Sequence, residues 1–495
     1  MVRLFIPDLI KKTGYLAALA LLAGCQSVKP LFQPEAVPLS DSRNTSVPAS
    51  FSRQTNYAND STSIAGQSWR AFFAEPALVA LIDTALTNNL DLRIALQRIE
   101  QARATFEYSR GFLAPQINAT ASAGVDRYGQ YTLNGVGNFD TNLSNNIRGD
   151  KLIPNPTPDY FLGFRSTWEL DIWGKLRNRR KAAYLRLLAS ERGRQAVVTS
   201  LVAQVARYYY ALLALDGELN IIQENIDFQQ RALELVRVQK QAGRVTELAV
   251  QQFAAQLLNT RSRQGQVRQQ AAQAENELNQ LLGRYPQPIA RGRSLEDREL
   301  PGQAPTGLPV QMLVRRPDIR QAELELQATN VDVDVARAEF LPSLNLSAYL
   351  GLNAFRVATL TNPGSIAAGL LGGLSAPLFN RRFLKANYRG SIAQSREAFF
   401  RYRQTVLTGF SEVSTQLQAV DNFRQVANWQ TQEVTTLRQA VSTSNDLFAS
   451  GYASYLEVIT AQRSVLEAEL ALINTKQAQF LAMTDLYRAL GGGWE

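Results

Sequence analysis

The sequence contains no histidine and only one cysteine, Cys25, among its 495 residues. Histidine is the usual general base of enzymes, and histidine and cysteine are the usual ligands of zinc. A single cysteine also excludes an intrachain disulfide. We therefore expect no enzymatic activity, no metal site and no cofactor.

Long runs of one charge are also missing. The net charge is +9, but the 52 Lys and Arg residues are dispersed and interleaved with Glu and Gln. No nucleic-acid-binding motif accompanies them, so we expect no nucleic-acid partner.

The longest apolar run near the N-terminus, residues 15–22, is too short to span a bilayer. It follows Arg3, Lys11 and Lys12 and leads into Leu22-Ala23-Gly24-Cys25. This pattern predicts a lipoprotein signal peptide over residues 1–24 and lipidation of Cys25, which would anchor the mature chain to a membrane. Gln26 favours the outer membrane by the usual sorting convention. The alternative is an incidental cysteine near an ordinary signal cleavage site.

Several motifs occur twice at matching spacings. The pairs are Asp91-Leu92-Arg93 and Asp318-Ile319-Arg320, Pro115 and Pro342, Gly124 and Gly351, Gly243-x-x-Thr246-x-Leu248 and Gly451-x-x-Ser454-x-Leu456, and Leu282-Gly283 and Leu490-Gly491. A repeat of this length indicates a duplicated half-structure. We therefore divide the mature chain into an extended arm (25–68), a first repeat (69–295) and a second repeat (296–495).

Residues 175–242 contain no proline, and their only glycines are Gly193 and Gly217. Apolar residues recur in this stretch at alternating spacings of four and three, which is a heptad seam. The pattern predicts one helix on the order of 100 Å long. Two core helices broken near Gly217 are the alternative.

Shorter elements flank this helix. The first repeat is expected to hold helices over 69–86, 91–113 and 247–282, strands over 117–125 and 161–168, and a long polar loop over 126–160. In the second repeat we expect a helix from Pro317, strands from Leu344 and over 366–378, and helices over 385–449 and up to Leu490. In each repeat the two shorter helices could stack end to end, antiparallel beside the long one.

Four strands cannot close a barrel, and a closed barrel is the only sheet that a bilayer tolerates. The chain must therefore supply its strands to an oligomer.

The chain resembles the TolC-like outer membrane factors, in particular the NodT-type lipoprotein branch. The resemblance rests on the Cys25 motif and on residues 315–323, 168–177, 377–379 and 486–494. It implies a mainly α fold with a β-barrel portion: a homotrimer with a 12-stranded outer membrane barrel and a 12-helix periplasmic tunnel. It also implies two partners, a periplasmic adaptor protein and an inner-membrane pump.

The resemblance places adaptor docking at the two helical tips, on Gly243, Thr246, Leu248, Gly451, Ser454 and Leu456. These residue types also suit a plain helical hairpin, since glycine permits the reversal and hydroxyls can cap the next helix. In the same way it places a gate at Leu456, Glu457 and Arg463. Thr460 occupies a position that is Asp in many relatives, which weakens an acidic ring, and a solvated Glu457 remains the alternative.

Basic residues cluster at the starts of both long helices, where the helix dipole disfavours cations. They are Lys175, Arg177, Arg179, Arg180 and Lys181, and Arg381, Arg382 and Lys385. We expect lipid headgroups to compensate these charges, with Trp168, Trp173 and Phe379 as an aromatic belt at the membrane interface. Plain solvation is the alternative.

The sequence therefore predicts an outer membrane channel component of a tripartite efflux system for small molecules. The exit duct of a type I protein secretion system is the alternative within this class. A coiled-coil structural protein would not explain the strands, and a lipid-anchored hydrolase would lack a histidine.

Overall fold

The computed structural model describes residues 63–298, 307, 309–379 and 381–494. Cys25, the predicted signal peptide and the predicted arm as far as residue 62 lie outside the described residues. The arm's last six residues are not simply extended, because they include a short 3-10 helix, η3 (Ile64–Gly66), whose Ile64 and Ala65 are buried in the helical core.

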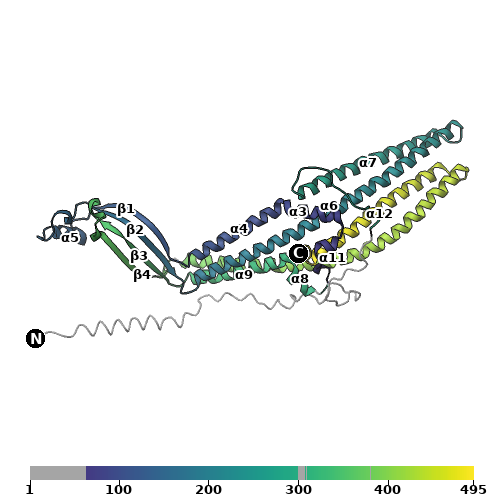
Figure 1. Cartoon of the computed structure of the whole chain (residues 1–495). Helices are drawn as coiled ribbons and strands as arrows, with labels where there is room; N and C mark the ends of the chain where they lie inside the picture. The colour runs from purple at the N-terminus through teal and green to yellow at the C-terminus, as the bar shows by residue number, and fades with distance from the viewer. Residues whose placement is uncertain (1–62, 299–306, 308, 380, 495) are drawn as a thin grey trace. The chain divides into compact units, whose positions relative to one another are not determined.

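The remaining elements follow one another in two similar series (Figure 1). After α2 (Trp69–Phe73) and α3 (Pro76–Asn88), the first series is α4 (Leu90–Gly111), β1 (Gln116–Asp126), β2 (Thr157–Leu170), α6 (Lys175–Gln241) and α7 (Glu247–Leu281). After α8 (Pro309–Arg315), the second is α9 (Pro317–Ala338), β3 (Ser343–Ala354), β4 (Ile366–Ser375), α11 (Arg381–Ala449) and α12 (Tyr455–Ala489).

The long helix predicted over 175–242 is continuous, and the two-helix alternative is wrong. Its seam residues Leu201, Val205 and Leu212 are at most 4% exposed, because α7, α9 and α12 pack around it. Gly217 lies inside α6, where a Cβ atom would come within 3.1 Å of Ile473 on α12. This glycine therefore lets two helices approach closely and does not end a helix.

The predicted end-to-end stacking of the shorter helices is confirmed in both series. Both α4 and α7 pack on α6, and the Asn89 side-chain amide at the start of α4 donates to the carbonyl of Leu281 at the end of α7 (2.9 Å). In the second series, Arg316 at the start of α9 donates to the carbonyl of Ala489 at the end of α12 (3.0 Å).

The repeated Leu-Gly motif serves these two junctions. Gly283 and Gly491 have φ values of +65° and +92°, which favour glycine. A Cβ atom on Gly283 would lie 2.5 Å from the Asn88 carbonyl oxygen, and one on Gly491 would lie 3.0 Å from the Arg316 nitrogen. The motif thus ends one helix and admits the start of the next.

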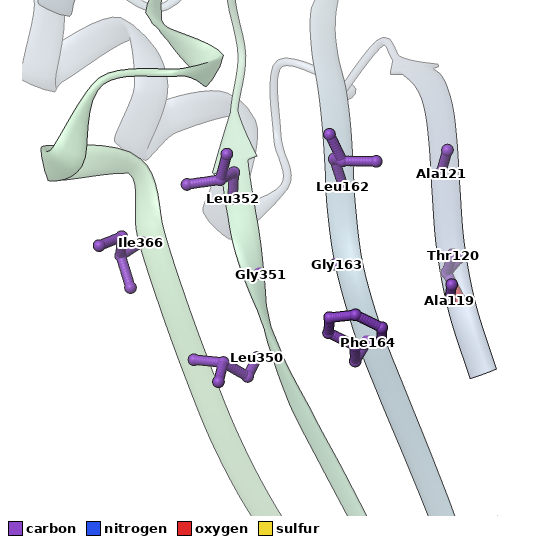
Figure 2. A pocket seen from close by; sticks show the side chains of 10 residues that line it. All are labelled: Ala119, Thr120, Ala121, Leu162, Gly163, Phe164, Leu350, Gly351, Leu352 and Ile366. Atoms are coloured by element: carbon purple, nitrogen blue, oxygen red, sulfur yellow. The ribbon is translucent and has the colours of Figure 1, made fainter. Parts of the chain in front are cut away.

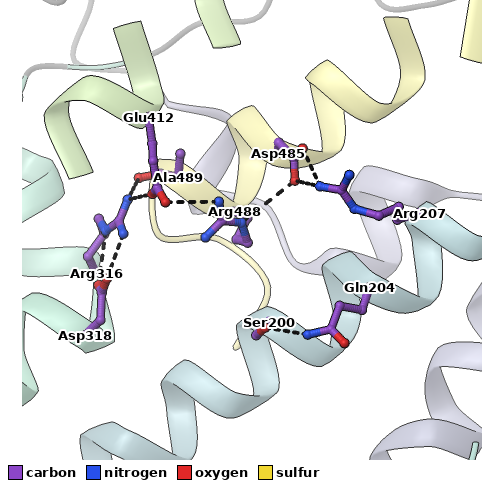
Figure 3. A network of polar contacts seen from close by, with 9 residues as sticks. All are labelled: Ser200, Gln204, Arg207, Arg316, Asp318, Glu412, Asp485, Arg488 and Ala489. Atoms are coloured by element: carbon purple, nitrogen blue, oxygen red, sulfur yellow. Dashed lines mark hydrogen bonds and ion pairs between the residues drawn. The ribbon is translucent and has the colours of Figure 1, made fainter. Parts of the chain in front are cut away.

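A chain of charges joins four helices at the second junction (Figure 3). The Arg316 side chain, 5% exposed, pairs with Asp318 (2.6 Å) and with Glu412 of α11 (2.7 Å). Glu412 also pairs with Arg488 of α12 (3.3 Å), and the adjacent Asp485 pairs with Arg207 of α6 (2.7 Å). Arg316 is the central member, because it is buried and bonds to three separate partners.

Several expected boundaries were wrong. The single helix expected over 69–86 is two helices, because Ala74 adopts a left-handed conformation (φ 49°) just before Pro76 starts α3.

The long loop after β1 contains a further helix, α5 (Leu133–Asn142), and the η4 turn (Gly149–Lys151). The β3–β4 connection holds α10 (Val357–Leu360) and η5 (Pro363–Ser365). The fourth strand ends at Ser375 rather than 378, and α11 begins at Arg381, four residues before the expected start.

Replacing Arg316 with methionine will destabilise the protein strongly. The change breaks the pairs with Asp318 and Glu412, which are part-exposed, while Glu412 keeps Arg488, and the lost charged hydrogen bonds cost about 2–3 kcal/mol. The matched control is Arg103→Met, which breaks an exposed i,i+3 pair with Glu100 and costs less than about 1 kcal/mol. Guanidinium unfolding of the detergent-solubilised protein measures both. Equal effects of the two changes would contradict the central role of Arg316.

Candidate functional site

The four described strands form one antiparallel sheet in the order β1-β2-β3-β4. The register aligns Leu162 with Ala121 on one side and Leu352 on the other, and Phe164 with Ala119 and Leu350. Side chains alternate between faces along a strand, so these residues share a face. Figure 2 shows them together around the Gly163–Gly351 pair.

This face, which we call the apolar face, carries no charged residue in the described strands. Its members from the first repeat are Ile117, Ala119, Ala121, Ala123, Val125, Tyr160, Leu162, Phe164, Ser166 and Trp168. Leu350, Leu370 and Leu374 are 58%, 77% and 70% exposed within the single chain. Strands of 10 to 14 residues with such a face have the length and pattern of outer membrane strands.

The opposite face, which we call the polar face, carries small, amide and charged side chains. Examples are Asn118, Ser122, Asp159, Asn345 and Asn353. Asn353 donates to the Asp159 carboxylate at 2.7 Å. In a membrane barrel, such a face lines the water-filled interior.

The sheet has two open edges. β1 pairs only with β2, and β4 pairs only with β3, among the residues described. The backbone groups along these outer edges therefore need partners from outside the described chain before the sheet can lie in a bilayer.

The predicted interface aromatics lie where the sheet meets the helices. Trp168 is near the end of β2 and donates its indole N–H to the Leu113 carbonyl (3.1 Å). Trp173 lies between β2 and α6, is 48% exposed, and donates to the Pro342 carbonyl (2.7 Å). Phe379, just before α11, is 99% exposed. Both indole donors are thus satisfied while the rings stay at the junction.

Three of the five basic side chains at the start of α6, those of Lys175, Arg177 and Arg179, have carboxylate partners within the chain. Asp171 accepts hydrogen bonds from the backbone N–H groups of Leu176 and Arg177 (both 2.9 Å) and pairs with the Arg177 side chain (3.0 Å). Lys175 pairs with Glu169 (2.5 Å) and Arg179 with Glu339 (3.8 Å). A carboxylate at the helix N-terminus offsets the dipole directly.

At the opposite end of α6 the chain reverses at Gly243, and at the end of α11 it reverses at Gly451. Their φ values are +72° and +81°. Leu248 and Leu456, in the first turns of α7 and α12, are 54% and 56% exposed. Tyr452, which the sequence analysis did not single out, is 86% exposed at the second tip.

The two tips differ in how the second helix begins. Thr246 occupies the N-cap of α7, but the described structure gives its hydroxyl no capping hydrogen bond, contrary to expectation. An ion pair between Lys240 and Glu247 spans that tip instead. At the second tip Ser454 is the N-cap of α12, and Glu457 accepts a hydrogen bond from the Ser454 backbone N–H (2.5 Å), as in a capping box.

Arg463, expected in the gate with Glu457, pairs within the chain with Glu467 one helical turn later (2.9 Å). Leu456, Glu457 and Arg463 lie on the first turns of one helix, so the chain does bring them to the same tip.

A sheet with one charge-free face and two open edges, joined to helices of 67 and 69 residues, defines a subunit of a membrane channel with a helical extension. The family model described as outer membrane efflux protein matches residues 81–284 and 308–492. The chain therefore belongs to the outer membrane efflux protein family, and it is the outer membrane channel component of an efflux system.

Curated relatives and solved structures agree with this assignment. The chain is 30% identical over 481 residues to the probable outer membrane lipoprotein SilC of Salmonella typhimurium, covering 97% of this chain and 98% of that protein. It is 33% identical over 431 residues to the pyoverdine export outer membrane protein OpmQ of Pseudomonas aeruginosa, covering 87% and 88%. The structure of the outer-membrane channel OprN matches with a TM-score of 0.82 at 26% identity, covering 91% of this chain and 98% of that one.

The position of Trp173 yields a test of where the membrane ends. In protein whose only tryptophan is Trp173, phospholipids with brominated acyl chains will quench the fluorescence, because the ring lies at the junction of the sheet and the helices. The control retains only Trp429, which is 64% exposed but lies about 70 Å along α11 from its start at 1.5 Å per residue. Equal sensitivity of the two proteins to the bromolipid would refute the placement of Trp173.

Proposed function

We propose that three copies of this chain close a 12-stranded outer membrane barrel whose helices continue as a periplasmic tunnel. This assembly would be the exit duct of a tripartite efflux system that exports small molecules. The observation that carries the proposal is that the sheet and the helical layer are open at the same two edges.

The two layers share one order of elements. α4 packs on α6, α6 on α9 and α9 on α11, which parallels the strand order β1-β2-β3-β4. One edge of the subunit therefore consists of β1 and α4, and the other of β4 and α11. Pairing of unlike edges between copies is a head-to-tail contact that closes into a ring.

Exposed apolar side chains lie on both helical edges. Ile94 and Tyr108 of α4 are 49% and 70% exposed, and Phe400 and Leu407 of α11 are 57% and 61% exposed. A second copy seated on these edges would bury them and pair the open strands at the same time. Three copies give the strand number that the family resemblance implies.

We further propose that the helical tips dock a periplasmic adaptor. Leu248, Leu456 and Tyr452 present apolar surface there, and the left-handed glycines Gly243 and Gly451 hold the reversals that expose it. Glu457 at the second tip would contribute to an acidic ring around the closed pore, and Leu456 would narrow that pore. Within one chain Arg463 pairs with Glu467, so any pairing of Arg463 with an acidic group of another copy would replace this bond.

Valine at position 451 will prevent adaptor docking and efflux while leaving trimers intact. A β-branched residue at φ +81° costs about 1–3 kcal/mol, which the turn relieves by changing shape. The assay is cross-linking to a periplasmic adaptor of the same genome, together with sensitivity to toxic small molecules in a strain that lacks its own channel.

The matched control is Gly265→Val, because Gly265 lies inside α7 and an added Cβ atom meets nothing within 4 Å. Undiminished cross-linking of the Gly451 variant would contradict docking at the tip. A wild-type channel that restores protein secretion but not small-molecule resistance would instead favour the type I secretion alternative.

Glu457→Gln will lower the cation selectivity of the channel and weaken its block by divalent cations. Glutamine keeps a hydrogen-bond acceptor for the Ser454 N–H, so the change mainly removes charge. Single-channel recording in planar bilayers measures both effects, and Glu234→Gln, which removes an exposed carboxylate of α6 outside the proposed gate, is the control. Recordings of Glu457→Gln that match the wild type would exclude an acidic ring at this position.

A further inference from the structure

Arg165 stands alone on the polar face of the sheet. The described strands carry four charged residues, Asp126, Asp159, Arg165 and Glu169, and Arg165 is the only basic one. Its register partners are Asn118 on β1 and Tyr349 on β3, both on the polar face. Arg165 is exposed and forms no ion pair with a carboxylate among the described residues.

The guanidinium of Arg165 rests on an aromatic platform. Its central carbon lies 4.7 Å from the centroid of the Phe161 ring. Phe161 is only 4% exposed, although it belongs to the face that carries the charged and amide side chains of the sheet. A buried phenyl ring on this face, with a cation over it, is a cation–π arrangement that holds the guanidinium in place.

Glycines on the neighbouring strands make room for the platform. A Cβ atom on Gly351 would lie 3.0 Å from the tip of the Phe161 ring, and one on Gly369 would lie 2.3 Å from the Tyr349 ring. The two rings therefore lie against the backbone of the adjacent strand, and they meet edge to face at 6.1 Å. Three strands thus combine to position one positive charge.

The carboxylates on the same face do not neutralise this charge. Asp126 is aligned with Thr157, eight residues from Arg165. Along the strand, Asp159 is six residues and Glu169 four residues from Arg165, which is about 20 Å and 13 Å between Cα atoms at 3.3 Å per residue. Both separations exceed the screening length of about 8 Å at physiological salt. Glu169 is in addition paired with Lys175 (2.5 Å), and Asp159 accepts from Asn353 (2.7 Å).

The geometry points to an anion-binding collar inside the barrel: three Arg165 guanidinium groups at one level, each supported by Phe161, that attract solutes carrying carboxylate or phosphate groups. This inference rests on the proposed trimeric barrel, because one chain supplies only one of the three charges. A ring of arginines of this kind selects anions in a water-filled pore. The collar would let the outer membrane segment influence which solutes pass through the channel.

Channel recordings test the collar. Arg165→Gln will lower the ratio of chloride to potassium permeability by about twofold at 0.15 M salt. In dilute salt the reduction will be severalfold, because the field of the three charges is screened less there. Citrate, as a multivalent anion, will block the wild-type channel and block the variant much less. Arg127→Gln is the matched control, because Arg127 is an exposed arginine just outside the end of β1, and it will leave citrate block unchanged.

A second variant keeps the test decisive if Arg165→Gln fails to assemble. Arg165→Cys places a thiol at the same site, and a cationic thiol reagent will restore the ratio of chloride to potassium permeability whereas an anionic reagent will lower it further. Unchanged selectivity and citrate block in Arg165→Gln, or a Cys variant that neither reagent alters, would overturn the collar. A wild-type protein that forms no channel at all would instead overturn the proposed duct, so the two failures are distinguishable.

Discussion

The hydrocarbon core of a membrane offers no partner for a backbone N–H or carbonyl group, and this constraint governs the whole molecule. The outer edges of β1 and β4 are unpaired within the described chain, while the apolar face of the sheet exposes large apolar side chains that suit contact with lipid. A single copy therefore cannot satisfy its own backbone in a bilayer. The helical layer is open on the same two sides, because α4 and α11 lie at its edges where β1 and β4 lie at the edges of the sheet. In the proposed trimer, pairing strands between copies and burying the helical edges would be one event.

Much of this architecture could be predicted from local signals in the sequence. The heptad seam of residues 175–242 predicted a continuous helix, since apolar spacing continues through Gly217 without a break. The repeated motifs predicted two equivalent series, and the similar lengths of the helices predicted stacking, which the Asn89–Leu281 and Arg316–Ala489 hydrogen bonds confirm. The tips were found because a glycine followed by a hydroxyl residue has a specific role at a helix reversal. The family resemblance rested in part on residues 168–177, 315–323 and 377–379, which lie within the ranges that the family model matches.

The features that could not be predicted depend on contacts between distant parts of the chain. Asp171 neutralises the start of α6 through backbone bonds that a charge count cannot reveal. At the first tip, the ion pair between Lys240 and Glu247 depends on the reversal of the chain, which brings the end of α6 beside the start of α7. Phe161 lies in the alternating pattern as one more aromatic residue. Phe161 can lie beneath Arg165 only because Gly351 leaves room for its ring. Gly351 follows Phe161 by about 190 residues and is aligned with Gly163 only once β2 and β3 pair.

That same β2–β3 pairing fixes an order of events in biogenesis. Strand β2 is made before α6 and α7, and its partner β3 follows only after both helices and the connection to the second half. Closing so long a loop costs entropy that the strand contacts alone must repay, so non-local pairing of this kind is slow. The helices, whose hydrogen bonds are local, can form first and bring the ends of β2 and β3 together. Until then the apolar face of β2 is exposed to water, and transiently exposed apolar surface of this kind makes a folding chain prone to aggregate.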